Sequence, residues 1–557
     1  MSTSLDRRDV LASAILTLIG VGIPLWMAAA AGALGLPTID DWVYTRGAQS
    51  IFQSGSFNMP GHTAAAIGQL VLVQPLLWLS GGEPWAFMAF GPMMASIAIV
   101  CTYLLGRQFV GRPSATFGVL LLVAFPGFGR EVTSFMTDVP AYALSVLCLW
   151  LGTKSLQGQG GRTLLVVSLG AGILAVSIRE FAIAAPLAVM LTAWIRGAPK
   201  DRAWLTGLLI FLIVAIAAVL AIASNANRFA PGAPRGSAPL SLAFIGGAFA
   251  TINLVLLPAI ILASRERISR LTSAHFVVAS VVTFLVILSP SGVLIGNYWT
   301  ANGIGSDLLL AGSRDMVFPG RVWALFEQLA IFSTVLTLAM VFAWATRNIT
   351  RVGSTGRARV RAAGTVLGWQ APLTLFLALY IAELVAYTQF GPILDRYLFP
   401  MVPVATILLL GGSKRPLEMG RGLAMSHAAF GCLAASALLL AANSLAYDAA
   451  RWRAGEAAES AGYDARTVDA GYEWVGYHAF GTARSGEADF VLPWYYEAIP
   501  AQLPCLVLSN SRLDDSPLKL IRFADSAYLN YLFVGPAEPL YLYRSTRDDC
   551  PTPSLGR

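Results

Sequence analysis

Apolar runs of roughly 18 or more residues, the length that a membrane-crossing helix needs, recur along most of this chain. Each run can cross a hydrocarbon core of about 30 Å as a helix. Inside lipid the backbone N–H and C=O groups cannot bind water, and runs of this length satisfy them within a helix rather than between barrel strands. The sequence therefore predicts an all-α polytopic membrane protein.

The composition excludes a soluble protein. Charged residues make up 12% of the 557 residues and hydrophobic residues 56%, and the mean hydropathy is +0.64. Soluble domains carry about a quarter charged residues. The net charge of +7 does not indicate nucleic-acid binding, because Arg and Lys gather in short loops between apolar runs. We expect membrane lipid, and no nucleic acid, as a partner.

The apolar runs indicate about 13 transmembrane helices within residues 1–446. Arg7 and Arg8 precede the first run, which is longer than the apolar part of a signal peptide and is followed by many others, so we expect an uncleaved helix. An outer loop at 37–83 follows, in which 64–80 is short and is expected to lie along the interface. The later runs lie at about 84–106, 113–128, 137–152, 163–178, 181–195, 203–224, 240–263, 273–295, 322–345, 364–388, 397–412 and 423–445.

The loop charges predict the orientation. Every second loop is basic and contains Arg107 and Arg112; Lys154 and Arg162; Arg196, Lys200 and Arg202; Arg265, Arg267 and Arg270; Arg347, Arg351, Arg357, Arg359 and Arg361; Lys414, Arg415 and Arg421. The alternate loops contain no lysine and most of the acids, namely Asp40, Asp41, Glu83, Glu131, Asp138, Glu180, Asp307, Asp315 and Asp395. Basic loops stay in the cytoplasm. We therefore expect a protein of the plasma (inner) membrane with a cytoplasmic N-terminus and an extracytoplasmic C-terminus.

The composition changes at residues 447–557, where charges, Gly and Tyr become frequent. Short alternating runs at Cys505–Leu508 and Pro539–Tyr543 are typical of strands between turns. We expect a small extracytoplasmic C-terminal domain, α/β or irregular. Cys505 and Cys550 lie in it, and in an oxidising compartment they can form a disulfide. The remaining cysteines fall in apolar runs and are expected to be small buried residues.

Two acidic patterns in the outer loops are candidates for chemistry. Asp40 and Asp41 follow the first helix and have Trp42 and Tyr44 beside them. Asp138 opens a span within the segment Thr137-Asp138-Val139-Pro140. Two structural alternatives remain open, namely that these are solvated loop charges and that Asp138 is a helix N-cap ahead of a first-turn proline.

Three motifs together resemble the GT-C superfamily of membrane glycosyltransferases, in the branch of protein O-mannosyltransferases and lipid A aminoarabinose transferases. Ile39-Asp40-Asp41-Trp42-Val43-Tyr44 is similar to the Asp-Glu/Asp-x-x-Tyr motif of the family's first outer loop. Phe135-Met136-Thr137-Asp138-Val139-Pro140 is similar to its Thr-Asp-x-Pro motif, and Asp395-Arg396-Tyr397-Leu398-Phe399-Pro400 resembles its late Arg-Tyr-x-x-Pro helix start. The resemblance covers about residues 10–445.

The resemblance implies an inverting transfer of a sugar from a polyprenyl phosphate to a hydroxyl of a glycan, lipid or protein acceptor. A carboxylate must take the proton of that hydroxyl, and arginines suit the departing phosphate because their fork binds its oxygens bidentately. The expected roles are catalysis for Asp40, Asp41 and Asp138; donor binding for Arg130, Arg179, Arg396 and Tyr397; and substrate stacking for Trp42 and Tyr44. The resemblance implies no particular cofactor, and a divalent metal ion on Asp41 or Asp138 stays open.

One departure and two alternatives limit this hypothesis. The aminoarabinose branch carries Lys-Pro-Pro in its interfacial helix, whereas the matching residues here are Val73-Gln74-Pro75. The lysine that would meet a phosphate is absent, so the aminoarabinose function in particular is not implied. A transporter or lipid-linked sugar flippase would place ionisable residues inside spans, and Glu383 is the best such candidate. An oligosaccharide ligase or polymerase of similar architecture is the second alternative.

Overall fold

The structure is a computed structural model of the chain. It describes residues 6–57, 59, 66–226, 242–267, 271–287, 293–303, 310, 316–351, 368, 370–389, 391, 393–411, 421–482, 488, 490–513, 518–521 and 527–550. Several loops whose charges indicated the orientation lie outside these residues, among them 227–241, 304–309, 352–367 and 412–420.

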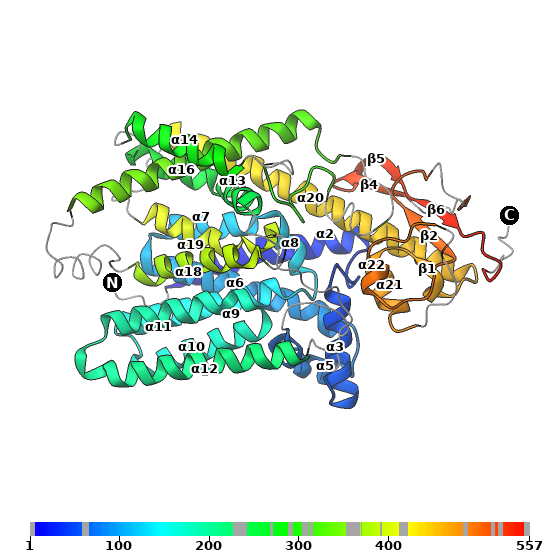
Figure 1. Ribbon diagram of the computed structural model, residues 1–557, viewed down its shortest axis with the longest axis horizontal. Helices are drawn as coiled ribbons and strands as arrows, with labels where there is room; N and C mark the ends of the chain where they lie inside the picture. The colour runs from blue at the N-terminus through cyan, green and yellow to red at the C-terminus, as the bar shows by residue number, and fades with distance from the viewer. Residues whose placement is uncertain are drawn as a thin grey trace.

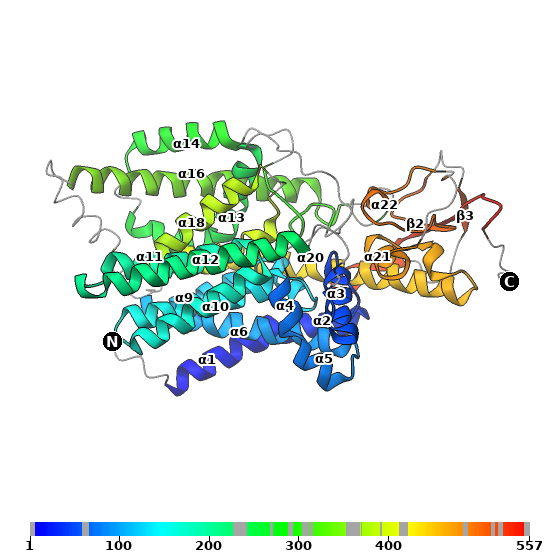
Figure 2. The ribbon, with the colours of Figure 1, turned by 60° about the horizontal axis from the view of Figure 1, so that its bottom comes forward.

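Most of the described chain is helical, and the helices run along the long axis of the molecule (Figure 1). The C-terminal strands gather at one end, and the two termini lie at opposite ends in both views (Figure 2). The long and the shorter apolar helices are α1 (Arg7–Thr17), the π-helical turn η1 (Leu18–Gly22), α2 (Ile23–Ala31), α6 (Trp85–Phe109), α7 (Arg112–Val123), α8 (Pro126–Val132), α9 (Asp138–Leu156), α10 (Gly161–Ile178), α11 (Ala184–Arg196), α12 (Arg202–Ala226), α13 (Leu242–Arg267), α14 (Ser273–Ile287), α16 (Gly320–Arg351), α18 (Ala371–Tyr387), α19 (Met401–Leu410) and α20 (Arg421–Ser460).

Within the described residues, 8 helices are long and apolar enough to cross a membrane, or up to 9 if a bent pair counts as one span. The multi-pass membrane fold is confirmed. The expected number of about 13 is higher, because several expected spans are helices too short for that criterion, such as Ala371–Tyr387 and Met401–Leu410. The span α13 is 78% buried within the protein but α12 only 17%, so α13 is central and α12 faces outward.

The expected span at 113–128 is not one straight helix. The helices α7 and α8 meet at an angle of 75°. Pro126 stands at the start of α8, and a proline has no N–H to continue the hydrogen bonds of the preceding helix. The break directs α8, with Arg130 and Glu131, across the end of the bundle.

The first outer loop folds into short helices that lie across the direction of the spans (Figure 1). They are α3 (Asp41–Ser54), α4 (Ile67–Leu72) and α5 (Gln74–Ser80). Gly55 ends α3 in the left-handed conformation, at φ 67°, which glycine adopts without steric cost. The described part of this interval, residues 66–80, thus contains two short helices where we expected one short interfacial helix over 64–80.

The C-terminal region contains a small mixed sheet. Its strands are β1 (Val468–Asp469), β2 (Leu506–Ser509), β3 (Lys519–Ile521) and β6 (Tyr541–Arg544), in the order β1-β2-β6-β3, beside a hairpin of β4 (Ala527–Tyr531) and β5 (Val534–Pro539) and the helices η7 (Ala465–Thr467), α21 (Tyr472–Ala479) and α22 (Tyr495–Ala498). The two strands expected from alternation correspond to β2 and β6, which pair antiparallel with Leu506 opposite Arg544. Cys505 and Cys550 are joined by a disulfide.

Helix α20 connects the membrane part to this region. It is 40 residues long, or roughly 60 Å at the usual helical rise, and therefore extends well beyond a bilayer. It passes residue 447 without a break (Figure 1). The domain boundary expected at that residue is thus not marked by a loop, and it stays a prediction.

Candidate active site

Asp40 lies where the first outer loop meets the C-terminal region. It is the N-cap of α3, and its side chain is 24% exposed. The hydroxyl of Tyr472 donates to Oδ1 at 2.9 Å. On the other side, Nη2 of Arg396 lies 3.8 Å from Oδ2, which is an ion-pair contact beyond hydrogen-bond distance. Asp40 thus keeps one carboxylate oxygen close to a cation and partly open to solvent.

Asp138 is held between two guanidinium groups at the first turn of α9. Its Oδ1 is 3.0 Å from Nε of Arg179, and its Oδ2 is 4.0 Å from Nε of Arg396. The N-cap position is occupied by Thr137, and neither side chain caps the helix. The N-cap alternative for Asp138 is therefore not what the structure has. Asp138 is 6% exposed, so its charge faces the arginines rather than solvent.

Arg396 sits in the short 3-10 turn η6 (Asp395–Tyr397), and Asp395 shapes that turn. The Asp395 carboxylate accepts the backbone N–H groups of Tyr298 at 2.8 Å and of Arg396 at 2.7 Å. Burial raises the pKa of Asp395, and these backbone donors act in the opposite direction. The Asp395 carboxylate is hydrogen-bonded to backbone N–H groups, and it is not an ion-pair partner for the guanidinium of Arg396.

The guanidinium of Arg396 is buried but only loosely paired. Arg396 is 4% exposed, and its Nε and Nη1 have no hydrogen-bond partner among the described residues. Its contacts with Asp40 and Asp138 are 3.8 and 4.0 Å long. A buried donor without a partner costs about 1–3 kcal/mol, and more when it is charged. Such an arrangement suits a group that receives an anionic ligand.

Arg179 is the second cation of this cluster. Its Nη1 donates to Oγ1 of Thr137 at 2.8 Å, and its guanidinium lies 4.8 Å from the ring centre of Tyr397. Phe181 and Tyr387 pack edge-on or tilted against the same ring. Tyr397 therefore supports Arg179 through a cation–π contact, and it is 6% exposed.

A pocket of about 330 Å³ opens beside these charges. Asp138, Arg179 and Arg396 line its polar side, and Tyr142, Phe376 and Phe399 line its apolar side. The four charged groups of the cluster, Asp40, Asp138, Arg179 and Arg396, come from four separate segments. Motifs that are far apart in the sequence thus bring their charged side chains together in the folded chain.

Glu131 belongs to the same neighbourhood and was not among the predicted site residues. It is 1% exposed, and both carboxylate oxygens lack a hydrogen-bond partner among the described residues. It lies close enough to interact electrostatically with Asp138 and Arg396. Its position next to Arg130 in α8 was visible in the sequence, but the bend that turns it inward was not.

Asp41 has a different environment from Asp40. It is buried, and its Oδ1 and Oδ2 accept the backbone N–H groups of Thr38 at 2.6 Å and of Phe135 at 3.5 Å. Burial raises its pKa well above the usual value, although these donors oppose the shift. Asp41 therefore joins the first outer loop to the segment before α9.

The aromatic residues beside these acids are also enclosed. Trp42 is 1% exposed and packs against Tyr472 and Phe480, with ring centres 6.0 and 5.7 Å apart. Tyr44 is 0% exposed. Neither ring presents a free face to a sugar in this structure, so the predicted stacking role of this pair has no direct support from their positions.

Arg130 lies in a second, fully buried ion network rather than beside Arg396. It pairs with Asp448, which also pairs with Arg451. Arg451 in turn pairs with Glu473 at 2.9 Å. The network joins α8, α20 and α21, and Glu473 extends it to the first outer loop by accepting the N–H of Ile39 at 2.9 Å. The sequence analysis did not anticipate this connection.

The surroundings of the two possible metal ligands are explained without a metal. Asp138 faces two guanidinium groups, and Asp41 accepts backbone N–H groups. A divalent cation requires several oxygen ligands and is repelled by neighbouring cations. Among the described residues, no group of three His, Cys, Asp or Glu side chains lies close enough to hold a metal ion.

The comparison with protein families agrees with the motifs. Residues 71–225 match the family described as dolichyl-phosphate-mannose-protein mannosyltransferase. This stretch contains Asp138 and Arg179, and therefore half of the charged cluster. The matched stretch, which is less than half of the chain, resembles the membrane glycosyltransferases of this family. The match confirms both the resemblance and the expected enzyme class, a glycosyltransferase that takes its sugar from a polyprenyl phosphate.

Solved structures of GT-C enzymes are similar only at the level of the whole chain. The crystal structure of ArnT from Cupriavidus metallidurans in the apo state has 13% identity, covers 96% of this chain and 97% of its own, and gives a TM-score of 0.38. The structure of ArnT bound to undecaprenyl phosphate has 14% identity, covers 98% of this chain and 99% of its own, and gives a TM-score of 0.41. The Archaeoglobus fulgidus oligosaccharyltransferase in complex with Zn and sulfate has 14% identity, covers 89% of this chain and 62% of its own, and gives 0.34. These scores assign no residue and no ligand to this chain. Curated protein sequences include no significant match.

Proposed function

We propose that this protein transfers a sugar from a polyprenyl phosphate to a hydroxyl acceptor at the extracytoplasmic face, in one displacement that inverts the anomeric carbon. The acceptor oxygen forms the new bond to that carbon while the bond to the phosphate oxygen breaks. The acceptor proton passes to Asp40, and the polyprenyl phosphate leaves as an anion. Both carboxylate and cation are then needed within a few ångströms of the reacting atoms.

The observation that carries the proposal is the loosely paired guanidinium of Arg396. Its Nε and Nη1 have no hydrogen-bond partner in the described part of the chain, and it lines the pocket together with Arg179. A phosphate would supply the missing acceptors, since its oxygens fit the arginine fork. The charge that accumulates on the leaving phosphate would be stabilised by donors that are already in place.

The position of Asp40 supports its role as the base. It is partly exposed, so an acceptor can reach it, and it is 3.8 Å from the cation that would hold the donor. Asp138 lies deeper, between Arg179 and Arg396. In this proposal Asp138 fixes the two guanidinium groups and does not itself take a proton. Asp41 holds the loop through backbone contacts.

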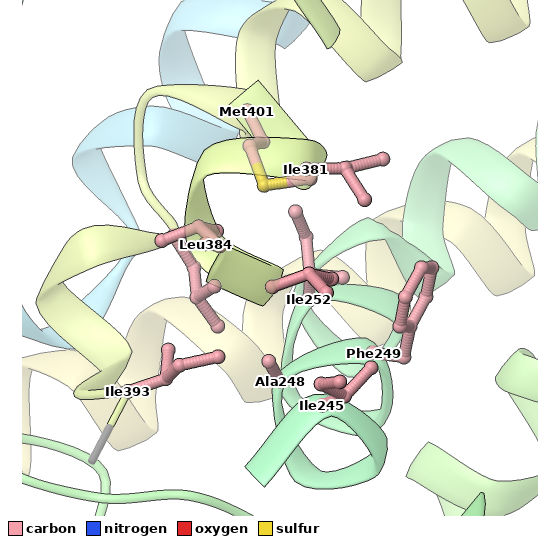
Figure 3. Close-up of a pocket in the computed structure, with 10 residues that line it drawn as sticks. Ile245, Ala248, Phe249, Ile252, Ile381, Leu384, Ile393 and Met401 are labelled. Atoms are coloured by element: carbon pink, nitrogen blue, oxygen red, sulfur yellow. The ribbon is translucent and has the colours of Figure 1, made fainter. Parts of the chain in front are cut away.

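The lipid part of the donor has apolar surface available on the other side of the same turn. A pocket of about 300 Å³ is lined entirely by apolar side chains from α13, α18 and the segment 393–401 (Figure 3). Leu398 and Met401 line it, and Arg396 precedes them in the chain. An isoprenoid chain gains roughly 0.8 kcal/mol for each buried CH₂ group. An apolar pocket and a cationic pocket that are both lined by the segment 393–401 fit a lipid phosphate better than a nucleotide sugar.

The charge bias of the loops supports the outer face as the site of transfer. The N-terminus is then cytoplasmic, and residues 447–557 form the extracytoplasmic C-terminal domain. The family match leaves both the sugar and the acceptor open. Glycans, lipids and proteins all remain acceptors to be tested.

Asp40→Asn is the decisive variant. It keeps the size of the side chain but removes the base, so turnover should fall by about 10²–10⁴-fold, while donor binding and thermal stability stay near those of the wild type. The assay measures free polyprenyl phosphate and sugar transfer when purified protein meets a panel of polyprenyl-phosphate sugars and envelope fractions as acceptors. Full turnover in Asp40→Asn would refute the assignment.

Arg396→Ala and Arg396→Lys separate donor binding from proton transfer. Arg396→Ala should weaken binding of polyprenyl phosphate, because the phosphate loses a charge-assisted partner. Arg396→Lys keeps the charge but not the fork, so it should restore binding only in part. Uptake of the same sugars into vesicles, without release of polyprenyl phosphate, would favour a transporter instead.

A further inference from the structure

We propose that the C-terminal region completes the catalytic centre, with Tyr472 as a positioning residue that holds the Asp40 carboxylate through a hydrogen bond. The inference rests on the proposed function, in which Asp40 is the base. Tyr472 and Asp40 are 432 positions apart in the chain, yet the phenol donates to Oδ1 at 2.9 Å. Oδ2 is thereby left to face the donor cation and the acceptor.

The Tyr472 hydroxyl has a fixed position because its ring is enclosed by other rings. Trp494 stacks on it with ring centres 5.5 Å apart and an interplanar angle of 24°. Trp42 and Tyr495 meet it at 6.0 and 5.9 Å. Tyr472 is 9% exposed, and burial raises its pKa well above the usual value. The phenol therefore stays protonated and can only act as the donor in this pair.

The helix that carries Tyr472 is locked against α3 at several points. The neighbouring Glu473 accepts the N–H of Ile39, and Arg46 donates to the carbonyl oxygen of Tyr477 at 2.6 Å. Gly476 allows the close approach, since a Cβ there would lie 2.3 Å from the Trp42 ring. Several residues of α21 thus hold residues on both sides of Asp40 in the first outer loop.

The backbone at Asp40 needs such support. Ile39 has φ 50°, a left-handed conformation that a β-branched residue rarely adopts. Strained conformations persist only where the surroundings determine them, and they cluster at functional sites. Glu473 receives the Ile39 N–H, and Arg451 holds the other oxygen of Glu473 at 2.9 Å. The support reaches from the buried ion network to the residue before the base.

Tyr472→Phe tests the inference with little change in shape, because the ring and its aromatic contacts remain. Without the Tyr472 hydroxyl, the Asp40 carboxylate is no longer fixed in orientation. We therefore expect kcat to fall about 3–10-fold, while the KM for the donor should not change. Replacing Tyr472 by 3-fluorotyrosine keeps a phenol donor at the same place and should keep kcat near that of the wild type.

Tyr495→Phe is the matched control. It removes another buried phenol of the same region, whose hydroxyl donates to Asp469 at 2.7 Å, and it should leave kcat and the KM for the donor near those of the wild type. A kcat of Tyr472→Phe equal to that of the wild type, or an equal loss of kcat in Tyr495→Phe, would overturn the inference. Activity retained in Asp40→Asn would instead overturn the proposed function itself, so the two failures are distinguishable. Thermal unfolding of each variant identifies a loss of folded protein, and the fluorotyrosine variant then decides.

Discussion

Removing the carboxylate of Asp448 should destabilise the protein far more than removing an exposed one. Asp448 pairs with both Arg130 and Arg451, and the side-chain exposures of these three residues are 3%, 1% and 0%. Asp448→Asn keeps the volume, but it leaves the buried Arg130 without its carboxylate and Arg451 with Glu473 as its remaining ion-pair partner. Breaking a buried ion pair by removal of one partner costs about 3–5 kcal/mol.

The magnitude follows from burial rather than from the number of ion pairs. Arg162 and Asp201 also pair, at 2.7 Å, but their side chains are 64% and 29% exposed. Exposed pairs contribute about 0–1 kcal/mol. Asp201→Asn is therefore the matched control, with the same chemical change at a solvated site.

The assay is an SDS titration in mixed micelles, followed by tryptophan fluorescence. Trp42, Trp452 and Trp474 are buried where α20 and the C-terminal region meet, so their emission reports on this contact. Asp448→Asn should lower the free energy of unfolding by at least ~3 kcal/mol relative to Asp201→Asn. A difference below ~1 kcal/mol would refute the view that this ion network holds the membrane part and the C-terminal region together.

Three further predictions concern orientation, redox state and pH. A reporter that is active only outside the cytoplasm should be active when fused after Trp42 or Gly455 and silent after Arg357, and activity at Arg357 would reverse the orientation. Non-reducing peptide mapping should recover Cys505 linked to Cys550, and free thiols in native membranes would contradict this. Because the two cysteines are separated by 45 residues, reduction should cost on the order of 4 kcal/mol of stability. Burial raises the pKa of Asp469 from 3.8 to about 6, so the folded state binds the proton more tightly than the unfolded state. This contribution to stability is present below about pH 4 and is lost as the pH rises through about 6. The thermal midpoint of the wild type should therefore fall over that window relative to Asp469→Asn, and parallel curves would exclude the prediction.

The parts of the fold that follow from local patterns could be predicted from the sequence. Apolar runs indicated a multi-pass membrane protein, and alternation indicated two strands that correspond to β2 and β6. The short connection between the expected runs at 163–178 and 181–195 is the end of α10 followed by the 3-10 turn η2 (Glu180–Ile183). Each of these features depends on residues that are neighbours in the chain, which is the range that periodicity covers.

The features that were missed depend on contacts between distant residues. Tyr472 and Glu473 had no local motif, and their partners Asp40 and Ile39 are more than 400 positions away. The bend before α8 was also missed, since the run at 113–128 was expected to be one span, and the burial of Glu131 depends on the surrounding helices. An acidic residue followed by aromatics, as at Asp40, indicates a site, whereas the residues that hold it are identified only by the folded chain.

Two of the three arginines predicted to bind the donor illustrate how the structure separates residues that the sequence treats alike. Arg130 and Arg396 are both buried residues near the outer end of the bundle, at 1% and 4% exposure. Arg130 has a partner at each guanidinium nitrogen, among them Ser444 at Nε, Thr133 at Nη1 and Thr38 at Nη2. A phosphate could bind it only by displacing those partners, at a cost of about 1–3 kcal/mol for each buried group left unpaired.

Arg396, in contrast to Arg130, has few hydrogen-bond partners that a phosphate would have to displace. Its carboxylate neighbours stand 3.8 and 4.0 Å away, and two of its nitrogens face no hydrogen-bond partner within the described residues. A phosphate at this place adds hydrogen bonds without removing any. The positive charge of Arg396 is then shared between the donor and Asp40, which draws the leaving group and the base to the same guanidinium. This shared contact is the physical reason to expect that Arg396→Ala weakens donor binding and also slows the transfer step, whereas Arg130→Ala acts through stability alone.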